Sequence, residues 1–184
     1  MAQRPGQVVL LNGVGSVGKS AIAKAMQAVT TDPYLHVPMD SFLDMLPAES
    51  FGRPEGLTFE ESLVDDSPVI HIRTGTFAEL TFHGMRQAVA AMSSVGLNLI
   101  VDDVVIAREV AEYRALIDRL HVVKVTAPLA VLEQRERLRG DRIVGLARGQ
   151  HPVLHADIVY DLTVRTESAS PEECAHLIAA TFGL

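Results

Sequence analysis

A glycine-rich segment near the N-terminus constrains the fold of this chain more than any other feature. Residues 13–20 read G-V-G-S-V-G-K-S, which matches the pattern G-x-x-x-x-G-K-S of a phosphate-binding loop. Glycines let backbone N–H groups converge on phosphate oxygens, and the N-terminus of a following helix adds a favourable dipole. The apolar run at 8–11 predicts a buried strand before the loop, and the run at 21–29 predicts a helix after it. The sequence therefore predicts a nucleotide site built on a strand, a loop and a helix.

The residues of this loop have distinct expected roles. We expect Lys19 to reach the β- and γ-phosphates of the nucleotide and the Ser20 hydroxyl to ligate Mg²⁺. The expected nucleotide-binding residues are Gly13, Val14, Gly15, Ser16, Val17, Gly18, Lys19 and Ser20.

Length and composition fit one globular domain over residues 1–184. The chain is 48% hydrophobic, and no Pro/Gly/Ser-rich linker divides it. Its formal charge of −7, without a block of lysines or arginines, argues against nucleic acid or an anionic membrane as a partner. Its one cysteine, Cys174, cannot form an internal disulfide, and no apolar run reaches the roughly eighteen residues of a membrane span. We expect a cytoplasmic protein.

A carboxylate lies shortly after the second expected strand, at 34–37. Asp40 would then stand at the carboxyl end of that strand, where open parallel α/β sheets form their ligand crevice. A carboxylate there can accept a proton from a substrate hydroxyl. The alternative is that Asp40 caps a short helix at 41–46, a role that aspartate fills well. Position alone leaves both interpretations open.

The segment at about 47–76 is the hardest to interpret. It is irregular and contains several glycines and prolines, and its second half indicates a hairpin that turns at 66–68. A long excursion between sheet strands is typical of a lid or binding loop, although it can also be a decorated edge. We expect this excursion to bind the acceptor.

Two further aspartates follow the apolar strand expected at 97–101. Asp102 and Asp103 match the second element of phosphate-loop enzymes, in which an acid after a buried strand holds Mg²⁺ directly or through water. We assign Asp102 to the metal and Asp103 to the substrate. Before this strand a helix is expected at 77–95, with His83 and Arg86 as solvated or core residues rather than ligands.

An arginine-rich segment follows a fourth strand expected at 122–125. The helix expected at 129–139 leads into it, and the segment at about 135–149 predicts a lid, because guanidinium groups chelate phosphate oxygens and neutralise developing charge. The expected phosphate contacts are Arg139 and Arg142, with Arg135 as a third. The alternative is a solvated helix face with i,i+4 pairs to glutamates.

The alternation of strands and helices, with a fifth strand at 162–164, predicts a three-layer α/β/α sandwich around a five-stranded parallel sheet. The sequence resembles the chloramphenicol phosphotransferase family over nearly its whole length. The segments that carry the resemblance are residues 13–20, Met39-Asp40-Ser41, residues 100–104, Arg139-Gly140-Asp141-Arg142 and Val159-Tyr160-Asp161.

The resemblance implies the fold of the phosphate-loop (P-loop) kinases, ATP with Mg²⁺, and phosphorylation of a primary hydroxyl on a small antibiotic. It implies that Asp40 is the catalytic base and that the residues after it, including Ser41 and Phe42, form the acceptor pocket. Residues 47–76 do not match the family pattern. The sequence therefore predicts a small-molecule O-phosphotransferase that acts on a hydroxyl of an antibiotic, and the alternative is a kinase for a sugar, nucleoside or other small metabolite on the same fold. A non-catalytic nucleotide switch is the rival from another class.

Overall fold

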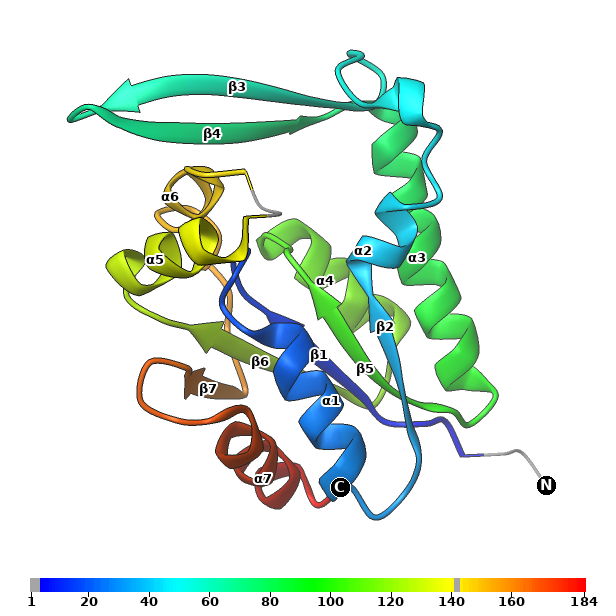
Figure 1. Ribbon diagram of the computed structural model, residues 1–184. Helices are drawn as coiled ribbons and strands as arrows, with labels where there is room; N and C mark the ends of the chain where they lie inside the picture. Colours follow the sequence, from blue (N-terminus) through cyan, green and yellow to red (C-terminus); the bar gives the residue numbers. More distant parts are fainter. Residues whose placement is uncertain (1–3, 141–142) are drawn as a thin grey trace.

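The computed structural model describes residues 4–140 and 143–184. Its centre is a five-stranded sheet in the order β2-β5-β1-β6-β7, and every neighbouring pair in it is parallel (Figure 1). The strands are β1 (Val8–Asn12), β2 (Tyr34–Pro38), β5 (Asn98–Asp103), β6 (Leu120–Thr126) and β7 (Leu162–Arg165). The predicted sandwich is confirmed, with strand ends that differ from the expected ones by no more than two residues.

Strand β1 is buried over its whole length because helices cover both faces of the sheet. Its side chains alternate, so that Val9 and Leu11 pack with α1 (Lys19–Val29) and α7 (Pro171–Phe182). Val8 and Leu10 pack on the other face, with α3 (Thr76–Ser94) and α4 (Ala107–Leu116). Figure 1 shows these two helical layers on either side of the sheet. No helix in the described part of the chain is long and apolar enough to cross a membrane.

The excursion between β2 and α3 is more regular than expected. It contains a 3-10 turn (Ala48–Ser50) and an antiparallel hairpin of β3 (Leu57–Val64) and β4 (Ser67–Thr74). The predicted hairpin is confirmed, but its turn is at Asp65 and Asp66, whose φ angles of 49° and 57° suit a two-residue hairpin loop. The part of β3 before Leu63 was missed because most of the hairpin is exposed on both faces, so its sequence lacks a clear alternation.

The helix after β2 also differs from its prediction. Helix α2 (Met39–Leu43) begins at Met39, with Pro38 as its N-cap. Asp40 is the second helical residue, so the interpretation of Asp40 as an N-cap is wrong. The proline before the helix already has the extended backbone that an N-cap requires.

The hairpin lies along a short helix that the sequence did not indicate, α6 (Leu146–Gln150), which follows α5 (Leu129–Arg139) (Figure 1). The Ile70 amide donates to the Gly145 carbonyl at 3.0 Å. At Gly149 the contact is closer still, because a Cβ atom there would lie 2.0 Å from the Ile70 carbonyl oxygen. Five residues are too few for a helical period to show in the sequence.

This contact predicts that alanine substitutions at two helical glycines change the free energy of unfolding in opposite directions. Gly149→Ala should destabilise the protein by about 1–3 kcal/mol, because the new methyl group pushes α6 away from β4. Gly84→Ala, in α3 where nothing lies within 4 Å of the added atom, should stabilise by about 0.5–1 kcal/mol through helix propensity. Urea unfolding of both variants measures the two changes, and equal stabilisation would contradict the docking of the hairpin on α6.

Candidate active site

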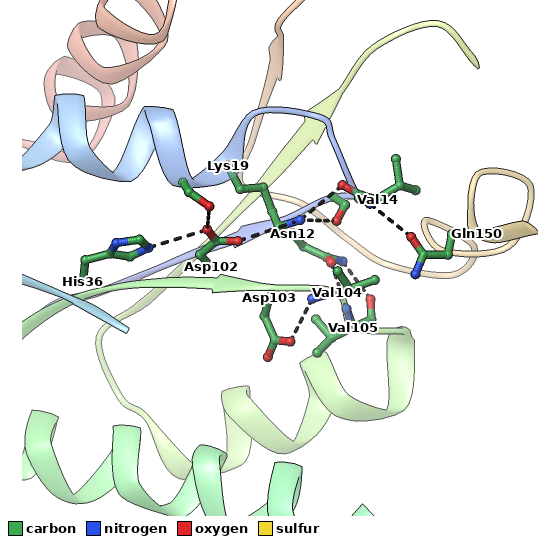
Figure 2. A network of polar contacts seen from close by, with 12 residues as sticks. Asn12, Val14, Lys19, His36, Asp102, Asp103, Val104, Val105 and Gln150 are labelled. Carbon is green, nitrogen blue, oxygen red and sulfur yellow. Dashed lines mark hydrogen bonds and ion pairs between the residues drawn. The ribbon is translucent and has the colours of Figure 1, made fainter. Parts of the chain in front are cut away.

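The register of the sheet brings the predicted functional residues to one edge. Leu11 pairs with Asp102 and Asn12 pairs with Asp103, while Pro38 of β2 pairs with Asp102 from the other side. The strands are parallel, so the loop after β1, the start of α2 and the end of β5 all lie at the carboxyl edge. Figure 2 shows the first and last of these side by side.

The loop at 13–20 wraps around the N-terminus of α1. Gly18 is the N-cap with a φ of 103°, and at Gly13 a Cβ atom would lie 2.4 Å from the Val125 carbonyl oxygen. Ser16 has a φ of 61°, which is uncommon for a residue other than glycine, and its hydroxyl is buried without a hydrogen-bond partner among the described residues. A strained loop with an unsatisfied polar group at the start of an eleven-residue helix fits an anion such as phosphate.

Lys19 is buried beneath this loop. Its Nζ donates to the carbonyl of Gly13 at 2.7 Å and is 3.2 Å from that of Val14 (Figure 2). The same atom is 3.8 Å from Oδ1 of Asp102. The ammonium group is therefore held at the loop by carbonyls that phosphate oxygens can replace.

Asp102 is surrounded by donors. The Ser20 hydroxyl donates to its Oδ2 at 2.6 Å, and Nε2 of His36 is 3.5 Å from the same oxygen. Burial alone would raise the pKa of Asp102, but His36, Lys19 and Ser20 outweigh it and hold the pKa below its usual value. An ionised carboxylate beside a hydroxyl is an oxygen pair that fits Mg²⁺, which proteins hold with few ligands besides substrate phosphates. No group of three metal-ligating side chains occurs in residues 4–140 and 143–184.

Asp103 faces the opposite side of the sheet, as alternation along a strand requires. Its carboxylate accepts from the Val104 amide at 2.8 Å and from the Tyr113 hydroxyl at 2.9 Å. Burial raises its pKa to about 6. The two aspartates are therefore divided between the phosphate loop and the space on the other side of β5.

That space is a cavity of about 1050 Å³ between the hairpin, α3, α4 and α6. Most of its lining is apolar, with Phe59 and Ile70 from the hairpin and Leu80 and Phe82 from α3. The excursion at 47–76 thus contributes a wall of the cavity. Asp103 stands at its inner end.

A charged cluster interrupts the apolar lining. Glu112 of α4 accepts from Nε of Arg86 at 2.5 Å, and its other oxygen is 2.6 Å from Nδ1 of His83. Arg86 is buried, which agrees with the expectation of a core residue. About half of the His83 side chain is exposed. Both side chains line the cavity, which a lone histidine and arginine in the sequence gave no reason to expect.

Helix α2 carries Asp40 to the same edge. The Asp40 side chain is exposed. Met39, just before it, and Leu43, three residues after it, line the cavity. The structure does not bring Asp40, Ser41 or Phe42 to that lining, because they lie on other faces of the helix than Met39 and Leu43. Ser41 is exposed, and Phe42 packs against the core on the α3 side of the sheet.

The first arginine of the arginine-rich segment is held by hydrogen bonds to a neighbouring loop. Arg135 donates to the Thr166 hydroxyl at 2.9 Å and to the Thr166 carbonyl at 2.8 Å. Together with Arg139 it lines a second cavity of about 310 Å³ beside the loop at 16–18. Arg142 lies outside the described residues.

The glutamates of α5 bind α6 rather than their own helix. Buried Glu136 accepts from the amides of Gly145, at 3.2 Å, and Ala147, at 2.7 Å. Glu133 pairs with Arg148. The expected alternative of i,i+4 pairs along a solvated face is therefore wrong for these two acids, because their partners come from the next helix.

Asn12 is another residue that sequence reasoning missed. Its side chain exchanges hydrogen bonds with Val105, donating to the carbonyl at 2.8 Å and accepting from the amide at 3.0 Å (Figure 2). It also donates to the Tyr160 hydroxyl at 2.9 Å, and that hydroxyl is 2.6 Å from Nδ1 of His155. A single polar residue in an apolar run was the available signal. These bonds join the ends of β1 and β5 beneath the site.

The sequence model of the family described as "chloramphenicol phosphotransferase-like protein" matches residues 6–183. The chain belongs to this family. Two strains of Mycobacterium tuberculosis, CDC 1551 and H37Rv, carry relatives that are provisionally named O-phosphotransferases. Each is 32% identical to this chain in an alignment that covers 95% of this chain and 82% of the relative.

Solved structures of kinases share the fold of this family member. A sugar kinase from Janibacter sp. has a TM-score of 0.69 at 15% identity, over 97% of this chain and 95% of its own. The APS kinase of M. tuberculosis, solved with AMPPNP and APS, has a TM-score of 0.67 at 14% identity, over 98% and 99%. A gluconokinase from Sinorhizobium meliloti has a TM-score of 0.62 at 16% identity, over 98% and 93%. At these identities the likeness shows the P-loop kinase fold.

The environment of Asp103 predicts a pH dependence of stability. Its pKa is raised in the folded protein, so the folded state holds the proton more tightly than the unfolded state does. The resulting stabilisation is complete at low pH and is lost as the pH rises through about 6. Asp103→Asn cannot titrate, so its stability relative to the wild type should increase between pH 5 and 7.5. Urea unfolding of both proteins tests this, since the other titrating groups are shared, and parallel pH profiles would refute it.

Proposed function

We propose that this protein is an ATP- and Mg²⁺-dependent O-phosphotransferase that phosphorylates a hydroxyl of a small molecule, in the first place an antibiotic. One observation carries the proposal. A phosphate loop with Lys19, Ser20 and Asp102 opens at the same sheet edge as Asp40 and a cavity of about 1050 Å³. A nucleotide-binding switch needs the loop but has no use for such a cavity beside it.

The donor half of the site would be built from the loop and α5. ATP supplies the phosphoryl group, and Mg²⁺ neutralises charge on it when both are bound. Lys19 exchanges its carbonyl partners for phosphate oxygens, and Ser20 with Asp102 holds the metal. The small cavity between Arg135, Arg139 and Thr166 suits the base or ribose end of the nucleotide. We assign the neutralisation of charge during transfer to Arg139, which lines this cavity, and, from the sequence alone, to Arg142.

The acceptor half would be built around Asp40. Its carboxylate orients the acceptor hydroxyl and takes its proton as the hydroxyl oxygen bonds to the γ-phosphorus. The bond from that phosphorus to the β,γ-bridging oxygen breaks, and ADP leaves with the electron pair. Asp103 and residues 47–76 contact the acceptor from the cavity side, and Phe42 supports the helix that carries Asp40 by packing against the core.

The lining of the cavity favours an acceptor with apolar surface. Phe59, Ile70 and Phe82 offer no hydrogen bonds, whereas a sugar presents hydroxyls in every direction that would lose water without finding partners. The charged cluster at Glu112 and Arg86 and the other polar residues of the lining, which include Glu109 and Arg108, can meet the polar groups of an acceptor. A hydroxylated antibiotic with an aromatic or aliphatic body fits this better than a sugar or nucleoside.

The direct experiment is a phosphorylation panel. The protein is incubated with ATP, Mg²⁺ and a set of hydroxylated antibiotics, sugars and nucleosides, and products are analysed by mass spectrometry for the gain of one phosphoryl group. We expect at least one antibiotic to gain it. If nucleotide binds but no compound is phosphorylated or stimulates ADP release, the proposal is wrong and a switch is favoured.

The base role gives a prediction with a matched control. Asp40→Asn keeps the size of the side chain but cannot take a proton, so kcat should fall about 10²- to 10⁴-fold with little change in nucleotide affinity. Asp44→Asn, one turn later on an exposed position, should leave kcat near the wild-type value. Steady-state kinetics with the acceptor from the panel measure both. Full turnover by Asp40→Asn would remove this residue from the mechanism.

A further inference from the structure

The side chain of Gln150 joins the two halves of the site. Gln150 is the last residue of α6, and its Oε1 accepts from the backbone N–H of Gly15 in the phosphate loop at 3.1 Å (Figure 2). The same side chain lines the large cavity. Gln150 therefore stands at the boundary where a phosphoryl group would pass from donor to acceptor.

The bond to Gly15 fixes the orientation of the Gln150 amide. A backbone N–H can only donate, so the oxygen of the amide must face the loop and the nitrogen must face away from it. Among the described residues the Gln150 side chain makes this one hydrogen bond, through Oε1, so Nε2 has no protein partner there. Figure 2 shows this nitrogen turned away from Val14 and the loop. Two donors are thus offered beside the phosphate loop with no partner from the described chain.

The backbone that carries Gln150 is held from two sides. Glu136 accepts from the amides of Gly145 and Ala147 at the start of α6. On the other side Gly149 is packed against the Ile70 carbonyl of the hairpin. A donor on such a fixed helix is organised before the ligand arrives, which is what positioning of a substrate requires.

We propose that Gln150 binds the acceptor, with Nε2 donating to an oxygen that neighbours the reacting hydroxyl while Oε1 remains on Gly15. The inference rests on the proposed function and narrows its substrate class. The acceptor is a hydroxylated molecule with a second oxygen, a hydroxyl or a carbonyl, close to the hydroxyl that is phosphorylated. Gln150 neither takes a proton nor binds the nucleotide.

Two substitutions separate this role from simple support of α6. Gln150→Met has a similar length but removes both the oxygen and the donors. Gln150→Glu keeps an oxygen for the Gly15 amide and has no N–H to donate. The control is Gln134→Ala, an exposed glutamine of α5. Urea unfolding identifies any variant that fails through loss of the fold.

The probes are the panel compound that the wild type phosphorylates fastest and its analogue without the neighbouring oxygen. At saturating ATP, both Gln150 variants should raise the acceptor KM about tenfold, the size expected for one lost hydrogen bond, and the control should not. For the wild type, the KM of the analogue should be higher than that of the parent compound by a similar factor. For Gln150→Met, the KM values of the analogue and of the parent compound should be almost the same. The affinity of Gln150→Met for a non-hydrolysable ATP analogue should stay within about twofold of the wild type.

Three results overturn the inference. A wild-type KM in Gln150→Glu means that the side chain only supports α6. If the KM rises by the same factor from the parent compound to the analogue in the wild type and in Gln150→Met, then Nε2 of Gln150 does not contact the neighbouring oxygen of the acceptor. A wild type that phosphorylates no panel compound refutes the proposed function itself, and the inference with it.

Discussion

The pairing of β1 with β5 is the constraint on which the site depends. Leu11 lies opposite Asp102 and Asn12 opposite Asp103, so the phosphate loop begins where the two carboxylates end their strand. A slip of one residue would turn every side chain of β5 to the other face of the sheet. Asp102 would then face the cavity side, and Asp103 would face the side of the phosphate loop. The apolar residues of both strands hold the register, because both faces of the sheet are buried, and Asn12 secures it through its bonds to Val105. One register thus puts Asp102 beside Ser20 and Asp103 beside the cavity.

Features with a local signal were predictable. The loop at 13–20 is recognisable because its glycines, lysine and serine are adjacent in sequence, and the buried strands are short apolar runs between turns. Helix α5 has the bounds that the sequence predicted, 129–139, and the capping box at Ser170 marks the start of α7. Asp102 and Asp103 could be placed at the sheet edge because they directly follow a buried apolar strand, and the carboxyl ends of parallel strands lie at one edge of the sheet. The family resemblance followed from the order of these segments.

Features that depend on distant partners were not predictable. Gly15 and Gln150 meet across 135 residues, and Asn12 and Tyr160 across 148, so no pattern in a window of sequence relates them. His36 and Glu136 read as ordinary polar residues until the fold supplies Asp102 for one and the α6 amides for the other. The hairpin lacked alternation because its faces are exposed. The large cavity therefore emerged only from the structure, and part of its lining comes from the stretch where the resemblance to the family is weakest.

The contacts at the loop describe a site poised for a nucleotide, and a crystal structure with Mg²⁺ and a non-hydrolysable ATP analogue tests this most directly. The account predicts that Nζ of Lys19 leaves the carbonyls of Gly13 and Val14 for phosphate oxygens, and that the Ser20 hydroxyl leaves Asp102 for the metal. The analogue should point its terminal phosphate toward Asp40 and the large cavity. An analogue bound elsewhere, or bound with the contacts of Lys19 and Ser20 unchanged, would contradict it.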